Sequence, residues 1–264
     1  MSQAALNFHR SIIPLNRATA KVKDNMHQKM NTDKLQQSRD TIESVELSIP
    51  ESELCARFEK LYSGAVNDVL REMCMPSQAL PPEIMPLRDE MVVCGPAFTV
   101  KSVKDPTMGG ELEMRVKMLD DLKPGHIVVW NAHGQMRASH WGGVMTQASL
   151  KAGCRGAIID GGIRDTKDIL SQKFPIWYRY RTSTGALAHT KVVSYQTPVF
   201  VGDVIIKPGD IILADIDGAL VIPRQMAVGV LERAEQIERN EGEIKEWVDA
   251  GLSAAEIHDR GGYF

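Results

Sequence analysis

The sequence predicts a single α/β domain built on a mixed sheet. Helical apolar spacing alternates with short apolar runs along residues 50–223, and this alternation is typical of helices packed against a sheet. KPGHIVVWNA (123–132) is echoed by KPGDIILADI (207–216), and in each a Pro-Gly turn precedes a buried strand. A hairpin is predicted after these units, and because its two strands are antiparallel the sheet is mixed. A long amphipathic helix is predicted after the hairpin.

Composition excludes several classes of protein. A chain of 264 residues with 43% hydrophobic content can bury a sizeable core. The formal net charge of −3 and the lack of a basic block argue against nucleic-acid binding, and no apolar stretch reaches the ~20 residues that cross a bilayer. The four cysteines, Cys55, Cys74, Cys94 and Cys154, lack metal-ligand spacing. We therefore expect buried free thiols and a cytoplasmic protein without membrane partners.

The first elements follow a polar segment. Residues 1–40 are polar and poor in aromatics, so we place an N-terminal extension at 1–45 and the domain at 46–264. Ser52 is predicted to cap the first helix, whose buried face carries Leu54, Phe58 and Leu61. A second helix is expected from near Ser63 to before Pro76, and residues 91–103 are expected to form a strand with a Gly-Pro break.

Two helix–strand units come next. The first helix has apolar spacing through Leu112, Val116 and Leu119 and leads into a strand at 126–132. The second carries Val144, Ala148 and Leu150, stops at Gly153 and precedes a strand through 157–159. Residues 207–223 are predicted to form a hairpin at Asp217-Gly218, and residues 225–250 a helix that ends at Gly251.

Two stretches suggest a binding site. In HWGGVM (140–145) two glycines open a helix, so free backbone amides can hold a small anion, although a tight turn explains the glycines equally well. In DGGIRD (160–165), Arg164 offers a planar fork for a carboxylate and Asp165 an oxygen ligand for Mg²⁺ or Mn²⁺. The alternative for this pair is a surface ion pair of little energetic value.

Other polar residues carry weaker signals. Asp215 and Asp217 allow a metal, but Asp-Gly favours a hairpin turn. His133 and His140 lie near the Gly-Gly opening and are candidate site groups. The remaining histidines have no companion at ligand spacing and are interpreted as surface or packing residues.

The order of these stretches resembles a known family. HWGGVMTQASLKAGCRGAIIDGGIRDTKDI and PVFVGDVIIKPGDIILADIDGALVIPR are its most specific parts, and the resemblance covers about residues 50–250. The chain resembles the regulator of ribonuclease activity A proteins and their relatives, the 4-hydroxy-4-methyl-2-oxoglutarate/4-carboxy-4-hydroxy-2-oxoadipate aldolases. The resemblance implies a β/β/α swivelling-type domain that assembles as a homotrimer or homohexamer.

The resemblance also implies roles for individual residues. Asp165 would bind a divalent metal, Mg²⁺ or Mn²⁺, and Arg164 would contact the keto-acid oxygens. The amides of residues 142–145, Gly142, Gly143, Val144 and Met145, would bind the pyruvyl carboxylate. Glu241, with Glu243 as an alternative, would be supplied to the metal's water shell by a neighbouring subunit.

One position departs from the aldolase pattern. The aldolases carry an acidic residue, then twenty residues, then Arg-Asp, and that position is Gly143 here. In the aldolases this acid helps to activate water for proton transfer, whereas the regulators tend to lack the metal carboxylate. His140 or His133 is a candidate to replace the missing acid.

The sequence predicts a metal-dependent lyase, an aldolase or oxaloacetate-type decarboxylase acting on small 2-oxo acids with a pyruvyl end. The alternative is a non-catalytic regulator that binds a ribonuclease or another partner.

Overall fold

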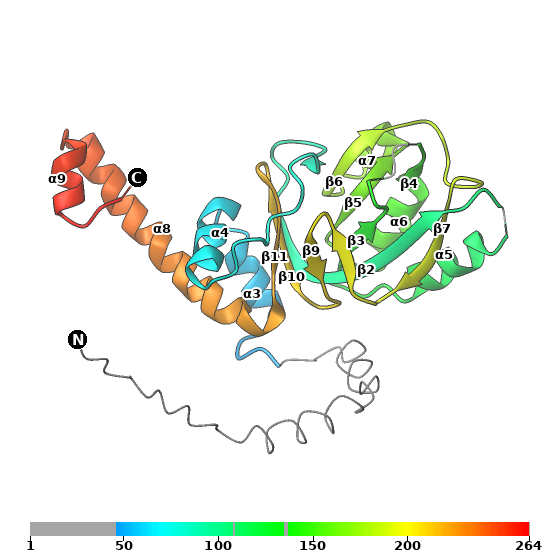
Figure 1. Ribbon diagram of the computed structural model, residues 1–264, viewed down its shortest axis with the longest axis horizontal. Coiled ribbons are helices and arrows are strands. Elements are labelled where there is room, and N and C mark those ends of the chain that lie inside the picture. Colours follow the sequence, from blue (N-terminus) through cyan, green and yellow to red (C-terminus); the bar gives the residue numbers. More distant parts are fainter. Residues whose placement is uncertain (1–45, 108, 135–136, 264) are drawn as a thin grey trace, which may run out of the picture. The chain divides into compact units, whose positions relative to one another are not determined.

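A mixed β-sheet organises the described part of the chain (Figure 1). The computed structural model describes residues 46–107, 109–134 and 137–263. The predicted N-terminal extension, residues 1–45, lies outside the described residues, so its role stays a prediction. The described strands are β1 Met85–Pro86, β2 Val93–Lys104, β3 Ile127–Asn131, β4 Ser139–Trp141, β5 Gly156–Ile163, β6 Ile176–Arg181, β7 Thr190–Tyr195, β8 Val199–Val201, β9 Val204–Ile206, β10 Ile211–Asp215 and β11 Gly218–Ile222.

The main sheet runs in the order β1-β6-β5-β3-β2-β10-β11, with β4 beside β5 and β7 beside β2. The pairs β2–β3, β3–β5, β4–β5 and β5–β6 are parallel, whereas β10 pairs antiparallel with both β2 and β11. β8 and β9 form a separate hairpin. The edge strand β1 also contacts β11 at the opposite edge, so the sheet is nearly closed. Parallel pairing brings the carboxyl ends of β3, β4, β5 and β6 to the same edge.

The central strands follow from their apolar runs. Every residue of β3 and of β5 is buried, which is typical of parallel strands covered on both faces. The described helices are α3 Glu51–Phe58, α4 Ser63–Glu72, α5 Glu111–Asp120, α6 Gly143–Lys151, α7 Thr166–Ser171, α8 Ala227–Asp249 and α9 Ala254–Asp259. This α/β architecture with a mixed sheet and a long C-terminal helix confirms the predicted fold class.

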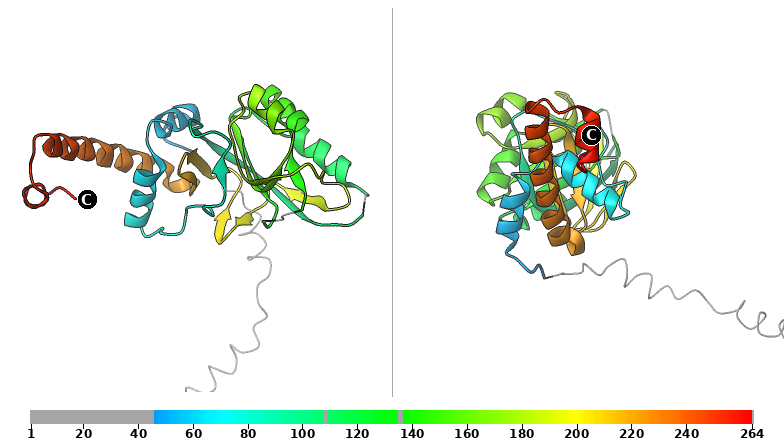
Figure 2. Two further views of the ribbon diagram at one scale, coloured as in Figure 1. Left: turned by 90° about the horizontal axis from the view of Figure 1, so that it is seen from above. Right: turned by 90° about the vertical axis from the view of Figure 1, so that its left-hand side faces the viewer.

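Two hydrophobic clusters fill the domain. The larger one centres on β2, β3, β5 and β6 and includes residues of α5, α6 and α7. The smaller one joins α3, α4 and the first half of α8 to β10 and β11. Figure 2 shows α3 and α4 beside the first turns of α8, as their contacts require. Of the helices in the larger cluster, α6 follows β4 and α7 follows β5.

Several predicted elements are confirmed. α4 begins at Ser63, β2 matches the predicted strand from Val93 onward and continues through Gly95-Pro96, and the hairpin turns at Asp217-Gly218. α8 ends just before Gly251, which takes a positive φ of 82°, as glycine does after a helix. The sequence analysis missed β1, β4, β6, β7 and the β8–β9 hairpin, and it also missed the short helices α7 and α9.

Other details were wrong. Pro50, not Ser52, precedes α3, and no side chain caps that helix. On α5 the predicted core residues Leu112 and Val116 are exposed, because Met118 faces the core instead. On α6, Val144 is 80% exposed, whereas Met145, Thr146 and Ser149 are buried. Cys74 is exposed, while the other three cysteines are buried free thiols. None of the described helices is long and apolar enough to span a membrane.

Asp215 is a structural residue of the hairpin turn. Its buried carboxylate accepts hydrogen bonds from the Ser63 amide (2.7 Å), the Ser63 hydroxyl (2.8 Å) and the Asp217 amide (3.0 Å). The carboxylate therefore ties the start of α4 to the β10–β11 turn, which supports the turn interpretation for this residue.

We predict that Asp215→Ala lowers the free energy of unfolding by about 3 kcal/mol, because two backbone amides lose their acceptor. Urea denaturation measures the change. The matched control is Asp217→Ala, since Asp217 is exposed and its loss should cost less than about 0.5 kcal/mol. Equal effects of the two substitutions would contradict this assignment.

Candidate functional site

A cavity of about 470 Å³ opens beside the carboxyl ends of β4 and β5. Its walls come from α5, from β4 with the start of α6, from the two residues that follow β5, and from the loop between β6 and β7. The lining residues are Leu112, Arg115, Ser139, His140, Trp141, Gly142, Val144, Met145, Arg164, Asp165, Thr184, Gly185, Ala186, Leu187 and His189. A second, more open hollow of about 430 Å³ is also lined by Arg164 and Asp165, together with residues 181–183.

Asp165 links two helices at the cavity. It is the residue before α7 and has a left-handed backbone (φ 55°, ψ 33°), yet its side chain does not cap α7. Its Oδ2 instead accepts a hydrogen bond from the Gly143 amide at 3.2 Å, at the first turn of α6. The carboxylate is 47% exposed, and its Oδ2 lies 3.6 Å from Arg164 Nε. A strained backbone that leaves a carboxylate half-exposed in a cavity points to a functional position.

The β4–β5 register places these residues side by side. Trp141 is the partner of Ile163, and the Arg164 amide donates to the Trp141 carbonyl at 3.0 Å. The chain therefore leaves both strands together, with Gly142 facing Asp165. A Cβ on Gly142 would lie 2.6 Å from Asp165 Oδ2, so only glycine permits this approach.

Gly143 is not among the residues that line the cavity. A Cβ at this position would overlap the carboxylate oxygen of Asp168, on the first turn of α7. The backbone of Gly143 is helical, without a left-handed φ. Its carbonyl accepts a hydrogen bond from Gln172 Nε2 at 3.2 Å. The space that a side chain at 143 would need is therefore taken by Asp168.

His140 is buried against the cavity and is 1% exposed. Neither ring nitrogen has a hydrogen-bond partner among the described residues. Burial, and then the nearby cation of Arg115, lowers the pKa of His140 to about 4. The imidazole is therefore neutral at neutral pH. Two nitrogens without partners beside a cavity are placed to hold a water molecule or a polar ligand atom.

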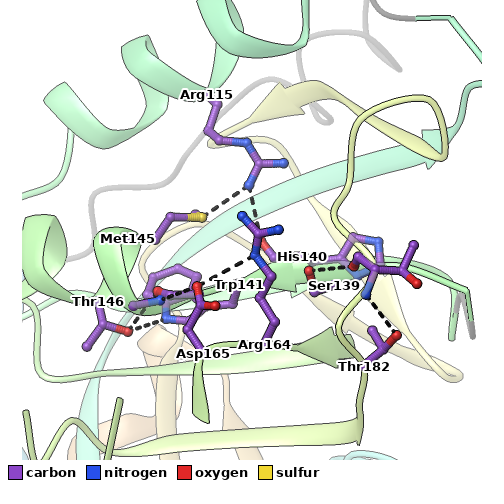
Figure 3. Close-up of polar contacts among 12 residues, drawn as sticks. Arg115, Ser139, His140, Trp141, Met145, Thr146, Arg164, Asp165 and Thr182 are labelled. Atoms are coloured by element: carbon purple, nitrogen blue, oxygen red, sulfur yellow. Dashed lines mark hydrogen bonds and ion pairs between the residues drawn. The ribbon is translucent and has the colours of Figure 1, made fainter. Parts of the chain in front are cut away.

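Arg115 reaches the same cavity from α5 (Figure 3). Its Nη1 donates to the His140 carbonyl at 3.2 Å and to Met145 Sδ at 3.1 Å. Its guanidinium lies 5.1 Å from the centre of the Trp130 ring, a cation–π distance. The sequence analysis assigned no role to Arg115, because an arginine on an amphipathic helix looks like any solvated residue. It also interpreted His189, another lining residue, as an ordinary packing or surface group.

The structure brings most of the predicted site residues together. Gly142, Val144, Met145, Arg164, Asp165 and His140 line the cavity. Gly143 and the exposed His133 are not among the lining residues. Glu241, on α8, accepts a hydrogen bond from the Tyr62 hydroxyl and does not line the cavity of its own chain. Its predicted role in a neighbouring subunit's site therefore stays a prediction.

The donor set at Asp165 fits a weakly held, hydrated cation. The described residues contain no cluster of three or more His, Cys, Asp or Glu side chains that could hold a metal. Mg²⁺ often keeps several waters and takes only one or two protein carboxylates. Asp165 supplies one, half-exposed on the cavity wall. Gly142 leaves the space beside it clear of a side chain.

A family model described as RraA-like, Aldolase/RraA, matches residues 63–221. A Halalkalibacterium halodurans protein named "Putative 4-hydroxy-4-methyl-2-oxoglutarate aldolase" is 28% identical over 190 residues, which are 72% of this chain and 86% of that protein. Protein DlpA of Legionella pneumophila is 27% identical over 67% of this chain. The match spans only 29% of the length of DlpA.

Solved structures share the fold. A crystal structure described as one of novel cellulases from gut-associated microbes is 48% identical, with a TM-score of 0.78 over 84% of this chain and 99% of that one. The structure of Streptomyces coelicolor RraAS2, described as an unusual member of the RNase ES inhibitor RraA family, is 25% identical. Its TM-score is 0.70, over 77% of this chain and 100% of that one.

We predict that His140 titrates near pH 4, well below the ~6.5 of an unfolded histidine. Between these values the unfolded chain binds more protons, so the free energy of unfolding falls by about 3 kcal/mol as the pH drops from 6.5 to 4. Above pH 6.5 the contribution is fully present. NMR titration of the His140 ring, with denaturation of wild type and His140→Gln across this range, measures both effects. A midpoint near 6.5 would contradict the prediction.

Proposed function

Because the chain belongs to the RraA-like (Aldolase/RraA) family, we propose that it is a divalent-metal-dependent carbon–carbon lyase. Its substrates are small 2-oxo acids with a pyruvyl end. The observation that carries this proposal is the meeting of Arg164, Asp165 and the first turn of α6 on one cavity. The volume of about 470 Å³ suits a small molecule.

Each group has a part in binding. The Arg164 fork binds the keto-acid oxygens, since a guanidinium matches a carboxylate in two hydrogen bonds. The amides of Val144 and Met145 lie in the first turn of α6, where amides lack partners within the helix. They bind the pyruvyl carboxylate, helped by the positive end of the helix. The Gly143 amide holds Asp165 in place instead.

Asp165 is the metal ligand in this proposal. A divalent cation there would supply Lewis-acid chemistry at the C2 carbonyl, where negative charge develops as the enolate forms. Arg164 complements the same charge from the protein. His140 is neutral but only weakly basic, so it orients a water molecule toward the reacting carbon rather than taking the proton itself.

The cavity suits a glycosidase less well. Glycoside hydrolases typically use two carboxyl groups, one on each side of the scissile bond. Among the described residues that line the cavity, Asp165 is the only acid. The similarity to a structure described as a cellulase therefore supports the shared fold rather than that activity.

A second candidate function is regulation by binding, as in the ribonuclease-inhibitor branch of the family. The observation that favours it is Gly143, where the aldolases carry an acid. A regulator would bind its partner without metal and would turn over no 2-oxo acid.

We propose a homotrimer or homohexamer for either function. The cavity rim of a single chain carries exposed apolar side chains, with Leu112 64% and Val144 80% exposed. Apolar surface of this kind is typical of a protein interface. A neighbouring copy covering this rim would also bring further groups, such as Glu241, toward the site.

We expect Asp165→Ala to abolish Mg²⁺-dependent turnover and to weaken Mn²⁺ binding at least tenfold, while the fold is kept. Mn²⁺ binding is followed by electron paramagnetic resonance and turnover by pyruvate release. Asp203→Ala, at an exposed turn, is the control. Retained metal-dependent turnover in Asp165→Ala would refute the assignment.

The glycine at position 143 predicts which of two reactions, decarboxylation or aldol cleavage, is faster. Aldol cleavage must remove the C4 hydroxyl proton before the C3–C4 bond breaks, so it needs a positioned base or activated water. Oxaloacetate decarboxylation has no such step, because loss of CO₂ leaves the enolate of pyruvate directly. We therefore expect wild type to decarboxylate oxaloacetate faster than it cleaves 4-hydroxy-4-methyl-2-oxoglutarate, with both rates measured in Mg²⁺.

The same comparison extends to variants. Gly143→Asp should raise the aldolase rate relative to the decarboxylase rate only if Asp168 moves aside. The double variant Gly143→Asp/Asp168→Gly provides that space, and Asp168→Gly alone is its control. Wild-type aldolase activity equal to the decarboxylase activity would show that a base is already present, and a water molecule held by His140 is the first candidate.

A further inference from the structure

Apolar side chains form much of the wall of the cavity. Those among its lining residues are Leu112, Trp141, Val144, Met145, Ala186 and Leu187. Val144 and Leu112 are the exposed apolar residues of the rim, and Leu187 is also 43% exposed. Exposed apolar side chains gathered in a cavity are typical of a surface that binds an apolar ligand group.

The loop between β6 and β7 runs from Arg164 toward α5. A Cβ on Gly185 would lie 2.9 Å from Arg164 Nη1, so this part of the loop lies against Arg164. Four residues later, the His189 carbonyl accepts a hydrogen bond at 3.0 Å from the amide of Asp105, which precedes α5. Leu187 lies between these two points and lines the cavity. A ligand that is held at Arg164 and extends along the loop therefore passes Leu187.

The helix α5 brings a second leucine next to this loop. Leu112 lies in the first turn of α5 and lines the cavity. α5 contacts β7, the strand that follows the loop. A Cβ on Gly110, the residue before α5, would lie 3.3 Å from Lys191 Nζ on β7. Leu112 and Leu187 therefore come from adjoining segments of the chain.

Two polar lining side chains outside the proposed pyruvyl site are engaged by protein groups. Arg115 Nη1 donates to the His140 carbonyl and to Met145 Sδ. The Ser139 hydroxyl donates to the Thr184 carbonyl at 2.9 Å. These polar groups have partners within the protein, so the leucines are the surface that is left to bind the far end of a ligand.

We infer that the site selects 2-oxo acids whose far end, away from the pyruvyl group, is apolar, and that Leu187 is a specificity-determining residue for it. The inference rests on the proposed function, in which Arg164 and the first turn of α6 hold the pyruvyl end. An alkyl group gains about fourfold in affinity for each methylene that it buries. A charged group at the same place would lose its hydration against apolar side chains.

The experiment measures the Kd of three unreactive 2-oxo acids by calorimetry, with Mg²⁺ present. 4-Methyl-2-oxopentanoate ends in a branched alkyl group, 2-oxoglutarate ends in a carboxylate, and 2-oxobutyrate is the short reference. We expect wild type to bind 4-methyl-2-oxopentanoate at least fivefold more tightly than either of the other two.

A substitution at Leu187 tests the residue itself. Leu187→Asn should raise the Kd of 4-methyl-2-oxopentanoate at least fivefold and change that of 2-oxobutyrate by less than twofold. Leu187 is replaced rather than Leu112, because Leu112 belongs to the rim proposed to contact a neighbouring copy. The matched control is Leu150→Asn, since Leu150 is 40% exposed on α6 and is not among the lining residues. It should change neither Kd. Light scattering and a thermal melt check the assembly and folding of both variants.

Every other result counts against the inference or against the proposed function. A wild type that binds 2-oxoglutarate as tightly as 4-methyl-2-oxopentanoate, or that binds no probe, would overturn the inference even if a variant fails to fold. An equal rise of both constants in Leu187→Asn would overturn the role of Leu187, because it marks a general loss of the cavity. If the apolar preference holds but neither oxaloacetate nor a 4-hydroxy-2-oxo acid is turned over, the lyase function fails while the binding preference stands.

Discussion

The hydrogen bond from the Gly143 amide to the Asp165 carboxylate joins two strand–helix units at the cavity. It depends on β4 and β5 ending together, where the Arg164 amide donates to the Trp141 carbonyl. It also depends on Gly142, whose missing side chain lets the carboxylate approach. Everything else in the proposed site, including the amides of α6 and the fork of Arg164, is positioned relative to this contact.

Few of the residues that line the cavity are charged: these are Arg115, Arg164 and Asp165. The guanidinium of Arg115 stacks over the Trp130 ring and donates a hydrogen bond to Met145 Sδ. Arg164 instead packs against the backbone at Gly185, where an added Cβ would lie 2.9 Å from Arg164 Nη1. The two arginines thus come from different elements and are fixed by different kinds of contact.

Much of the fold follows from sequence patterns, because buried parallel strands are continuous apolar runs and glycines mark the helix ends. β6 to β9 were missed, since they are short or carry polar side chains. The burial of α5 and α6 was mispredicted because Leu112 and Val144 point to the cavity rim rather than to the core. Arg164 and Asp165 stood out through the family motif, but Arg115 did not. Its position depends on how α5 packs over Trp130, which no local pattern encodes.

Asp165 has one oxygen committed to the start of α6, and this division has a thermodynamic consequence. A ligand that draws the carboxylate away leaves the Gly143 amide without its acceptor, so occupancy of the site and order of the first helical turn become linked. A change far along α6 that loosens that turn would then alter ligand affinity at Asp165, by at most the coupling free energy between the two. Ligand affinity at the cavity therefore depends on how well ordered the first turn of α6 is.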